Sequence, residues 1–294
     1  MAKRAPIPQD VLCKIKHIEI YTRRLLSGAL VGDTRSAIKG TGFEFDQIRE
    51  YTQGDDVRFI DWNASARMNK LLVKQYTQER SRTVLLAVDI SASRQFGDKN
   101  GSKADLMTHI AGVLALVATY GNDNVSLILF SDKIEQYIPP GRGRFHSRVI
   151  LEALFSAEPQ GTGTSVECVL KQLARLKRRD GIAFLISDFI DDNFETYVPV
   201  VSRMYDVIAL RCLSEYEHAL PNIGFLTTYD LETGQEVMID ARNKGSESFS
   251  ALLHNRLEKQ NTLFKRHGID VVDITKREHC VGDVIRFFRR RMCY

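Results

Sequence analysis

The chain has 294 residues, of which 44% are hydrophobic and 27% charged, so it can bury a sizeable core without disulfides or a structural metal. Its 41 lysines and arginines and 37 aspartates and glutamates leave a net charge of +4, far from that of a typical basic nucleic-acid binder. The five cysteines form no Cys-x-x-Cys or zinc-ligand pattern, which favours the reducing cytoplasm. The N-terminus lacks an apolar signal core, and the longest apolar stretch, 110–120, is too short to span a membrane. We therefore expect a soluble, cytoplasmic protein without a membrane span.

Residues 1–80 show no alternation of strands and helices. An amphipathic helix is predicted over 9–27, and a stretch rich in Asp and Arg, punctuated by Gly, follows it. No repeat, low-complexity tract or long Pro/Gly/Ser linker separates this part from the rest. We expect residues 1–80 to pack against a main domain that spans 81–294.

From Thr83 onward, short β-branched apolar runs alternate with longer stretches of helical periodicity, which is typical of a parallel sheet with crossover helices. The predicted elements are strand 83–89, helix 103–120, strands 125–131 and 133–139, helices 145–155 and 166–177, strand 182–188, helix 194–204, strand 207–214, helix 246–267, strand 269–275 and helix 279–291. The tightly joined second and third strands predict a hairpin at the sheet edge. Residues 223–240 alternate like an inserted β-hairpin. The predicted fold class is α/β, a doubly wound and mostly parallel sheet with an N-terminal extension and this insertion.

Polar residues follow several of the predicted strands, where ligands of open α/β sheets bind. Asp89, Ser91 and Ser93 come at the end of the first strand, Ser187-Asp188 ends a later one, and the loop Gly161-Thr162-Gly163-Thr164-Ser165 opens a helix. Oxygen ligands with few formal charges suit a hard divalent cation, above all magnesium. The simpler interpretation is that these Ser and Asp residues cap the helices that follow.

Two groups of residues carry a family resemblance. Asp89-x-Ser91-x-Ser93, Thr164 and Asp188 resemble the metal-ion-dependent adhesion site of von Willebrand factor type A domains, and the order of elements from 83 to 291 is similar to that Rossmann-like fold. The earlier part resembles the signature block of the bacterial domain-of-unknown-function 58 (DUF58) family. The matching residues are Gly40-Thr41-Gly42-Phe43-Glu44-Phe45, Arg49-Glu50-Tyr51, Gly54-Asp55-Asp56, Arg58, Ile60-Asp61-Trp62, Ser65-Ala66-Arg67 and Glu79-Arg80.

The resemblance implies that Ser91, Ser93 and Thr164 contact Mg²⁺ (or Mn²⁺ or Ca²⁺), with Asp89 and Asp188 acting directly or through water. It further implies that a partner's carboxylate completes the site. Members of this family often accompany MoxR-type AAA+ ATPases, in systems thought to mature or remodel other proteins.

The sequence departs from the family pattern in two ways. Many relatives carry membrane helices before the signature block, and this chain has none there, which favours a cytosolic role. Many also have Met after the second Ser, where this chain has Arg94. The arginine places a positive charge near the proposed cation.

A second candidate site lies in the signature block. Its charged residues surround the only tryptophan; the candidate partner-binding residues are Asp55, Asp56, Arg58, Trp62 and Arg67. One interpretation is a docking surface for a partner. The spacing favours the other, a tight turn held by Asp/Arg pairs over a buried Trp62.

No enzyme motif is present: Gly40-x-Gly42 is not a dinucleotide fingerprint, and Gly101-Ser102-Lys103 is not a P-loop. We therefore predict a non-enzymatic, metal-dependent interaction module, an adaptor or co-chaperone of a MoxR-type ATPase that grips an acidic side chain on a partner. The alternative is a magnesium-dependent hydrolase with Asp132 or Asp191 as general base. A third hypothesis, a nucleic-acid binder that uses the basic N-terminal part, is weaker, and no specific nucleic acid is expected.

Overall fold

A computed structural model describes residues 15–16, 22, 43–53, 55–78, 82–92, 97–98, 101–161, 163–176, 181–191, 193–213, 224–229, 236–240, 243–276 and 279–292. Its centre is a six-stranded sheet in the order β12-β9-β8-β3-β6-β7. The strands are β3 (Thr83–Asp89), β6 (Asn124–Phe130), β7 (Ile134–Gly141), β8 (Ile182–Ser187), β9 (Asp206–Cys212) and β12 (Asp270–Ile274). All neighbours pair in parallel except β6 and β7, the predicted antiparallel edge hairpin.

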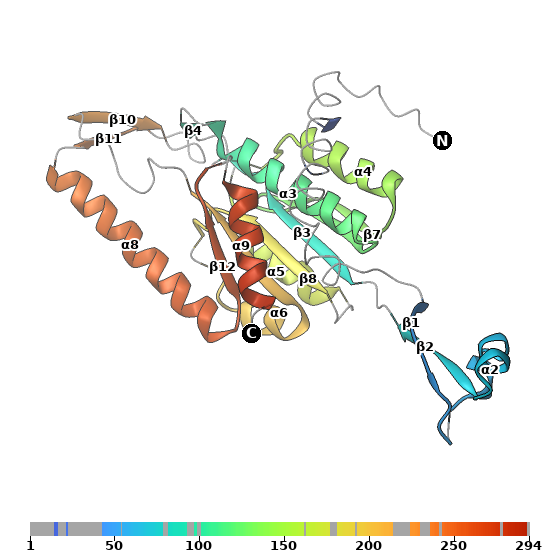
Figure 1. Ribbon diagram of the computed structural model, residues 1–294. Coiled ribbons are helices and arrows are strands. Elements are labelled where there is room, and N and C mark those ends of the chain that lie inside the picture. The colour runs from blue at the N-terminus through green and yellow to red at the C-terminus, as the bar shows by residue number, and fades with distance from the viewer. Residues whose placement is uncertain are drawn as a thin grey trace, which may run out of the picture.

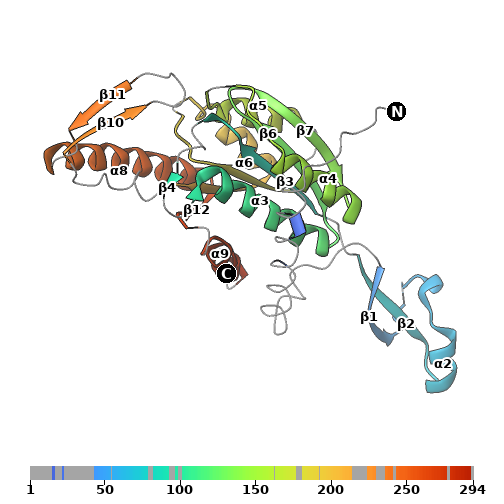
Figure 2. The same cartoon turned by 90° about the horizontal axis from the view of Figure 1, so that it is seen from above.

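Helices cover both faces of this sheet (Figures 1 and 2). On one face lie α3 (Lys103–Tyr120), α4 (Arg144–Phe155) and α9 (Cys280–Met292); on the other lie α5 (Val166–Arg175), α6 (Val198–Met204) and α8 (Asn243–Arg266). Successive side chains of a strand point to opposite faces of the sheet, so the core consists of two parts, one under each group of helices. On β3, Val84, Leu86 and Val88 pack toward α3, and Leu85 and Ala87 toward α5. The predicted doubly wound α/β fold is confirmed.

The chain order of the strands determines where a site can form. After β3 the chain adds β6 and β7 on one side, then crosses to the other side and adds β8, β9 and β12. The order therefore reverses at β3, and such a switch point is where α/β sheets bind ligands, beyond the carboxyl ends of the strands. Here those ends belong to β3 and β8.

Helix α6 is shorter than predicted, and the inserted hairpin lies within its predicted bounds. Helix α6 begins at Val198 rather than at 194, because Pro199 fits only the first turn of a helix. The inserted hairpin is present as β10 (Phe225–Tyr229) and β11 (Glu236–Asp240), which pair antiparallel. Among the residues that the structure describes, none of the helices is both long and apolar enough to cross a membrane.

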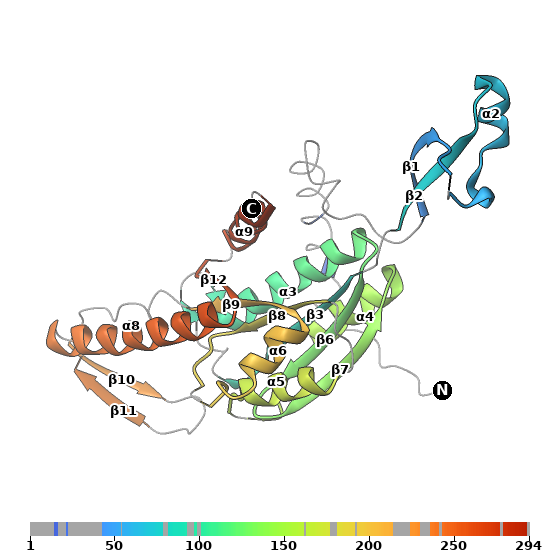
Figure 3. The ribbon, with the colours of Figure 1, turned by 90° about the horizontal axis from the view of Figure 1, so that it is seen from below.

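Residues 43–78 form a separate unit, which we call the arm. Strands β1 (Phe43–Glu50) and β2 (Leu72–Gln78) pair antiparallel, and η2 (Val57–Phe59) and α2 (Trp62–Met68) lie in the connection between them. Figures 1 and 3 show the arm extending away from the sheet. The expectation that residues 1–80 pack on the main domain stays a prediction, because most of residues 1–42 lie outside the described residues. The predicted helix over 9–27 lies outside the described residues except for Ile15, Lys16 and Thr22, which are helical. Of these, Ile15 is buried in the main core.

Candidate functional site

Asp89 and Asp188 come together at the carboxyl edge of the sheet. Asp89 ends β3 and Asp188 follows β8, and these strands are parallel neighbours. Both residues are buried, with exposed fractions of 0% and 2%. Asp89 accepts hydrogen bonds from the Ser91 N–H at Oδ1 and from the Ser187 hydroxyl at Oδ2, each at 2.8 Å. The Ile190 N–H donates to Asp188 Oδ1 at 3.0 Å. Neighbouring groups of the chain thus hold both carboxylates in place.

The fourth oxygen of this pair, Asp188 Oδ2, accepts a hydrogen bond from the ammonium group of Lys103 at 2.8 Å. Lys103 is the first residue of α3 and is only 3% exposed. Asp89 lies in the same buried surroundings. Its burial, together with the negative charge of Asp188, raises the pKa of Asp89 to about 6. Among the described residues, the site therefore brings together two carboxylates and an ammonium group, all removed from water.

The loop before α5 is held beside this edge by acidic side chains. Glu135 accepts hydrogen bonds from the N–H groups of Gln160 and Gly161, and from the Ser131 hydroxyl. A Cβ atom at Gly161 would collide with the side chains of Ser131 and Asp132, which would have to move to admit any residue other than glycine. These bonds hold Gln160 and Gly161 in place, and the predicted ligand Thr164, farther along the same loop, is half-buried.

The two predicted general bases contribute to local structure. Asp191 accepts the Val166 N–H at the start of α5 through Oδ2 and the Asn193 N–H through Oδ1. Asp132 is exposed and accepts a hydrogen bond from the Ser131 hydroxyl. Asp191 thus serves as a cap for α5, and the geometry gives neither residue a distinctive catalytic setting.

The predicted cation can be tested against these residues. Ser91 and the two aspartates offer the hard oxygen donors that magnesium prefers, while Ser93 and Arg94 lie outside the described residues. Lys103, however, already places a positive charge on Asp188. In the described part of the chain, no group of three or more His, Cys, Asp or Glu side chains could hold a metal ion. The described residues do not fit a divalent cation, because its charge would compete with a buried ammonium group for the same carboxylate.

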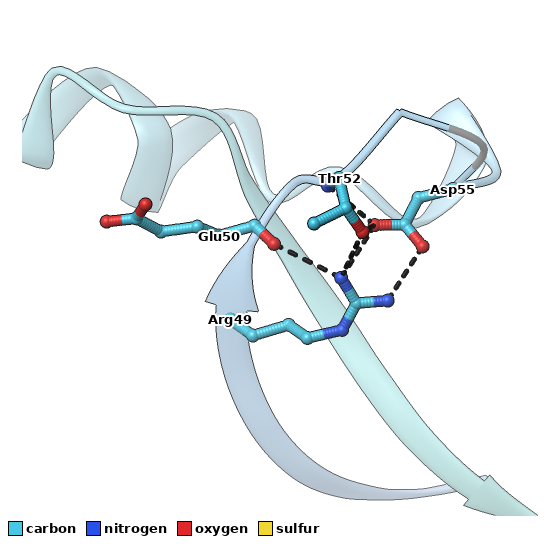
Figure 4. Close-up of polar contacts among 4 residues, drawn as sticks. All are labelled: Arg49, Glu50, Thr52 and Asp55. Carbon is cyan, nitrogen blue, oxygen red and sulfur yellow. Dashed lines mark hydrogen bonds and ion pairs between the residues drawn. The ribbon is translucent and has the colours of Figure 1, made fainter.

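The arm holds the second candidate site. Arg49 donates to both carboxylate oxygens of Asp55 at 2.7 Å, and Thr52 donates to Asp55 through its N–H and its hydroxyl (Figure 4). These contacts, chiefly the Arg49 guanidinium, lower the pKa of Asp55 well below its usual range. Asp56 accepts hydrogen bonds from the side chain and the N–H of Arg58. The predicted Asp/Arg pairs are therefore present.

The position of Trp62 differs from the favoured interpretation of the signature block, in which a tight turn covers a buried tryptophan. It is 66% exposed at the start of α2, where Asp61 caps the helix by accepting the N–H groups of Asn63 and Ala64. Arg67 is exposed on the same helix. In the described part of the arm there is a two-stranded sheet with short helices and no second layer of structure that covers the indole. The prediction of a buried Trp62 was wrong.

Comparison with known proteins places the chain in a family. Residues 47–258 match the sequence model of the family described as "Protein of unknown function DUF58". The chain belongs to the DUF58 family. It is 27% identical over 282 residues to the uncharacterized protein Rv1480 of Mycobacterium tuberculosis, covering 94% of this chain and 88% of that protein. It is 26% identical over 159 residues to the uncharacterized protein MAV169 of Mycobacterium avium, covering 52% of this chain and 93% of that protein.

Solved structures were also compared with this DUF58 chain. BatB from Bacteroides thetaiotaomicron is 13% identical and covers 71% of this chain and all of that one, with a TM-score of 0.47. A von Willebrand factor type A protein from Catenulispora acidiphila is 10% identical and covers 72% of this chain and 42% of that one, with a TM-score of 0.41. Because both scores lie below 0.5, we take the fold of this DUF58 protein from its own sheet order.

Sequence reasoning missed Lys103. A signal for it existed, because Lys103 stands three residues before Leu106 and seven before Ile110, in phase with the buried face of the helix. A lysine at a position where the pattern requires an apolar residue indicates a buried charge, which in turn requires a carboxylate partner. Ser187 was noticed as part of Ser187-Asp188, but its hydrogen bond to Asp89 depends on the pairing of β3 with β8.

Proposed function

We propose that this DUF58 protein is a non-enzymatic protein-interaction module, an adaptor or co-chaperone that works with a MoxR-type AAA+ ATPase in protein maturation or remodelling. The observation that carries the proposal is the apolar surface of the arm. Trp62 and Met68 are 66% and 68% exposed, and the arm also exposes Ile48, Val57, Phe59 and Leu71. Large apolar side chains gathered on a projecting unit are typical of a protein-binding surface.

The carboxyl edge of the sheet offers a second, smaller contact. Ile190, two residues after Asp188, is exposed there, and the half-buried Thr164 adds a hydroxyl group. The family resemblance assigns this edge to a partner's acidic side chain, held through a divalent cation. Within the described residues, the buried Lys103 makes binding of that cation unfavourable. We therefore propose that contacts of the arm contribute most of the free energy of partner binding. The hydrolase alternative gains no support from Asp132 or Asp191.

Substitution of Trp62 tests the proposal directly. We expect Trp62→Ala to weaken binding of the purified MoxR-type ATPase of the same organism by about 30-fold, the loss of one hot-spot side chain. Because Trp62 is exposed, the substitution should leave the melting temperature unchanged. The affinity can be measured by biolayer interferometry. In the unmodified protein, emission of this single tryptophan should also change on binding.

A matched control separates the arm from exposed apolar surface in general. Phe145 on α4 is 80% exposed and lies in the main domain, so Phe145→Ala should bind the ATPase as the unmodified protein does. Equal affinities for the Trp62→Ala and Phe145→Ala variants would show that the arm is not the docking surface. Failure of the unmodified protein to bind the ATPase would refute the partnership itself.

A further inference from the structure

Lys103 occupies a position that is unfavourable for a cation unless anions lie next to it. It is the first residue of an 18-residue helix, and the N-terminus of a helix carries a partial positive charge. Its side chain and that of Asp188 are 2% and 0% exposed. Removing an ammonium group from water costs several kcal/mol, which nearby opposite charge must offset. Asp188, at the end of β8, accepts a hydrogen bond from this ammonium group and provides that charge, and the buried Asp89 lies on the neighbouring strand β3.

The oxygens of these two aspartates are already hydrogen-bonded within the chain. The donors to Asp89 include Ser91 and Ser187, and those to Asp188 include Ile190 and Lys103. The only one of these four donors with a formal positive charge is the Lys103 ammonium group. A lysine on a helix that packs against the sheet thus brings a cation to the switch point of the fold.

We infer that the Lys103 ammonium group takes the place of a divalent cation at this edge, so that the site is complete without a metal. The chain itself provides the positive charge that pairs with Asp188, beside the buried Asp89. This inference is independent of the proposed function, because it concerns the charge of the site and not the identity of a partner. It assigns Lys103 the role of an internal counter-ion.

The inference makes opposite predictions for two forms of the protein. The unmodified protein should show the same melting temperature, within about 1 °C, in EDTA, millimolar MgCl₂ and millimolar MnCl₂, because it has no metal to gain or lose. Lys103→Met removes the ammonium group but keeps an unbranched side chain of similar length. It should lower the melting temperature in EDTA by about 10 °C, because the buried Asp188 loses its counter-ion beside the second buried carboxylate, Asp89. Magnesium or manganese should restore at least half of that loss.

Two further variants show whether the carboxylates cause the effect. Lys171 is exposed on α5, so Lys171→Met removes a lysine of the same kind and should change neither stability nor metal response. The double variant Lys103→Met/Asp188→Asn should be more stable in EDTA than Lys103→Met alone, and less responsive to magnesium, because one of the two negative charges is gone.

Calorimetric titration of the unmodified protein keeps the test decisive even if Lys103→Met fails to fold. The absence of a heat signal with Mg²⁺ and Mn²⁺ supports an internal counter-ion. A saturable signal that Asp89→Asn abolishes would overturn the inference and restore a metal site. A folded Lys103→Met variant that is equally stable with EDTA and with magnesium would also overturn it. Because none of these measurements uses the ATPase, their outcome is separate from that of the Trp62 experiment.

Discussion

At the carboxyl edge of the sheet, a buried lysine pairs with the buried Asp188, next to the buried Asp89, whereas the arm keeps its Arg49–Asp55 and Asp56–Arg58 pairs near the surface. The two regions also differ in how far their apolar side chains are exposed. Strands β3 and β8 bury theirs in two core layers, while the arm exposes Trp62 and its apolar neighbours. The sheet edge pairs its charged and polar groups within the chain, and the arm leaves apolar surface for contact with another molecule.

This difference indicates how each region should respond to mutation. Breaking a buried ion pair leaves the other charge in a poorly solvated place and costs several kcal/mol. An exposed pair loses little, because water and salt solvate the charge that remains. Substitutions at the sheet edge should therefore change stability, and substitutions on the arm should change binding without changing stability.

The largest effect is expected from Asp188→Asn. It leaves Lys103 buried without the negative charge of Asp188, so we expect a loss of about 3–5 kcal/mol in the free energy of unfolding. Urea denaturation followed by circular dichroism measures this loss. The matched substitution on the arm is Asp56→Asn, which removes the partner of the exposed Arg58 and should give an unchanged midpoint. Equal effects of the two substitutions would remove the contrast between the regions.

A smaller effect is expected from Gln260→Ala on α8. The buried Gln260 side chain donates to the Phe189 carbonyl at 2.7 Å and accepts from Arg211 at 3.2 Å. Phe189 follows Asp188 directly and has φ of 56°, a strained value for a non-glycine residue. Loss of these bonds should cost about 1–3 kcal/mol, because a buried carbonyl loses its donor.

The exposed Asn255 on the same helix provides the control for Gln260. Asn255→Ala should leave the unfolding midpoint unchanged, since this side chain is exposed. Denaturation of both variants by urea makes the comparison. If Gln260→Ala is as stable as Asn255→Ala, α8 does not help to hold the backbone beside Asp188, and the sheet edge depends on fewer contacts than we infer.

Much of the fold could be predicted because local patterns carry it. The apolar runs of β3, β8 and β9 and the periodicity of α3 are visible in the sequence, and Asp89 and Asp188 follow from their positions at strand ends. Lys103 was missed because its partner, Asp188, lies 85 residues away and belongs to another element. Trp62 was misjudged for the converse reason. A buried tryptophan needs a second layer of structure over it, and local sequence does not show whether one exists.

The smallest expected effect concerns pH and distinguishes two carboxylates within the arm. Arg49 and Thr52 lower the pKa of Asp55 well below its usual range, and Arg58 lowers that of Asp56. A carboxylate whose pKa is lowered in the folded state stabilises the fold at pH values above its unfolded pKa, about 3.9. This contribution is lost as the pH falls through the folded pKa.

The N–H groups of Thr52 and Arg58 donate to Asp55 and Asp56, so the NMR chemical shifts of these two amides report the protonation of each carboxylate. On acidification the Arg58 amide should shift first and the Thr52 amide later, and Asp55→Asn should abolish only the Thr52 change. If both amides shift at the same pH, the bidentate Arg49 contact adds nothing beyond what an exposed pair provides.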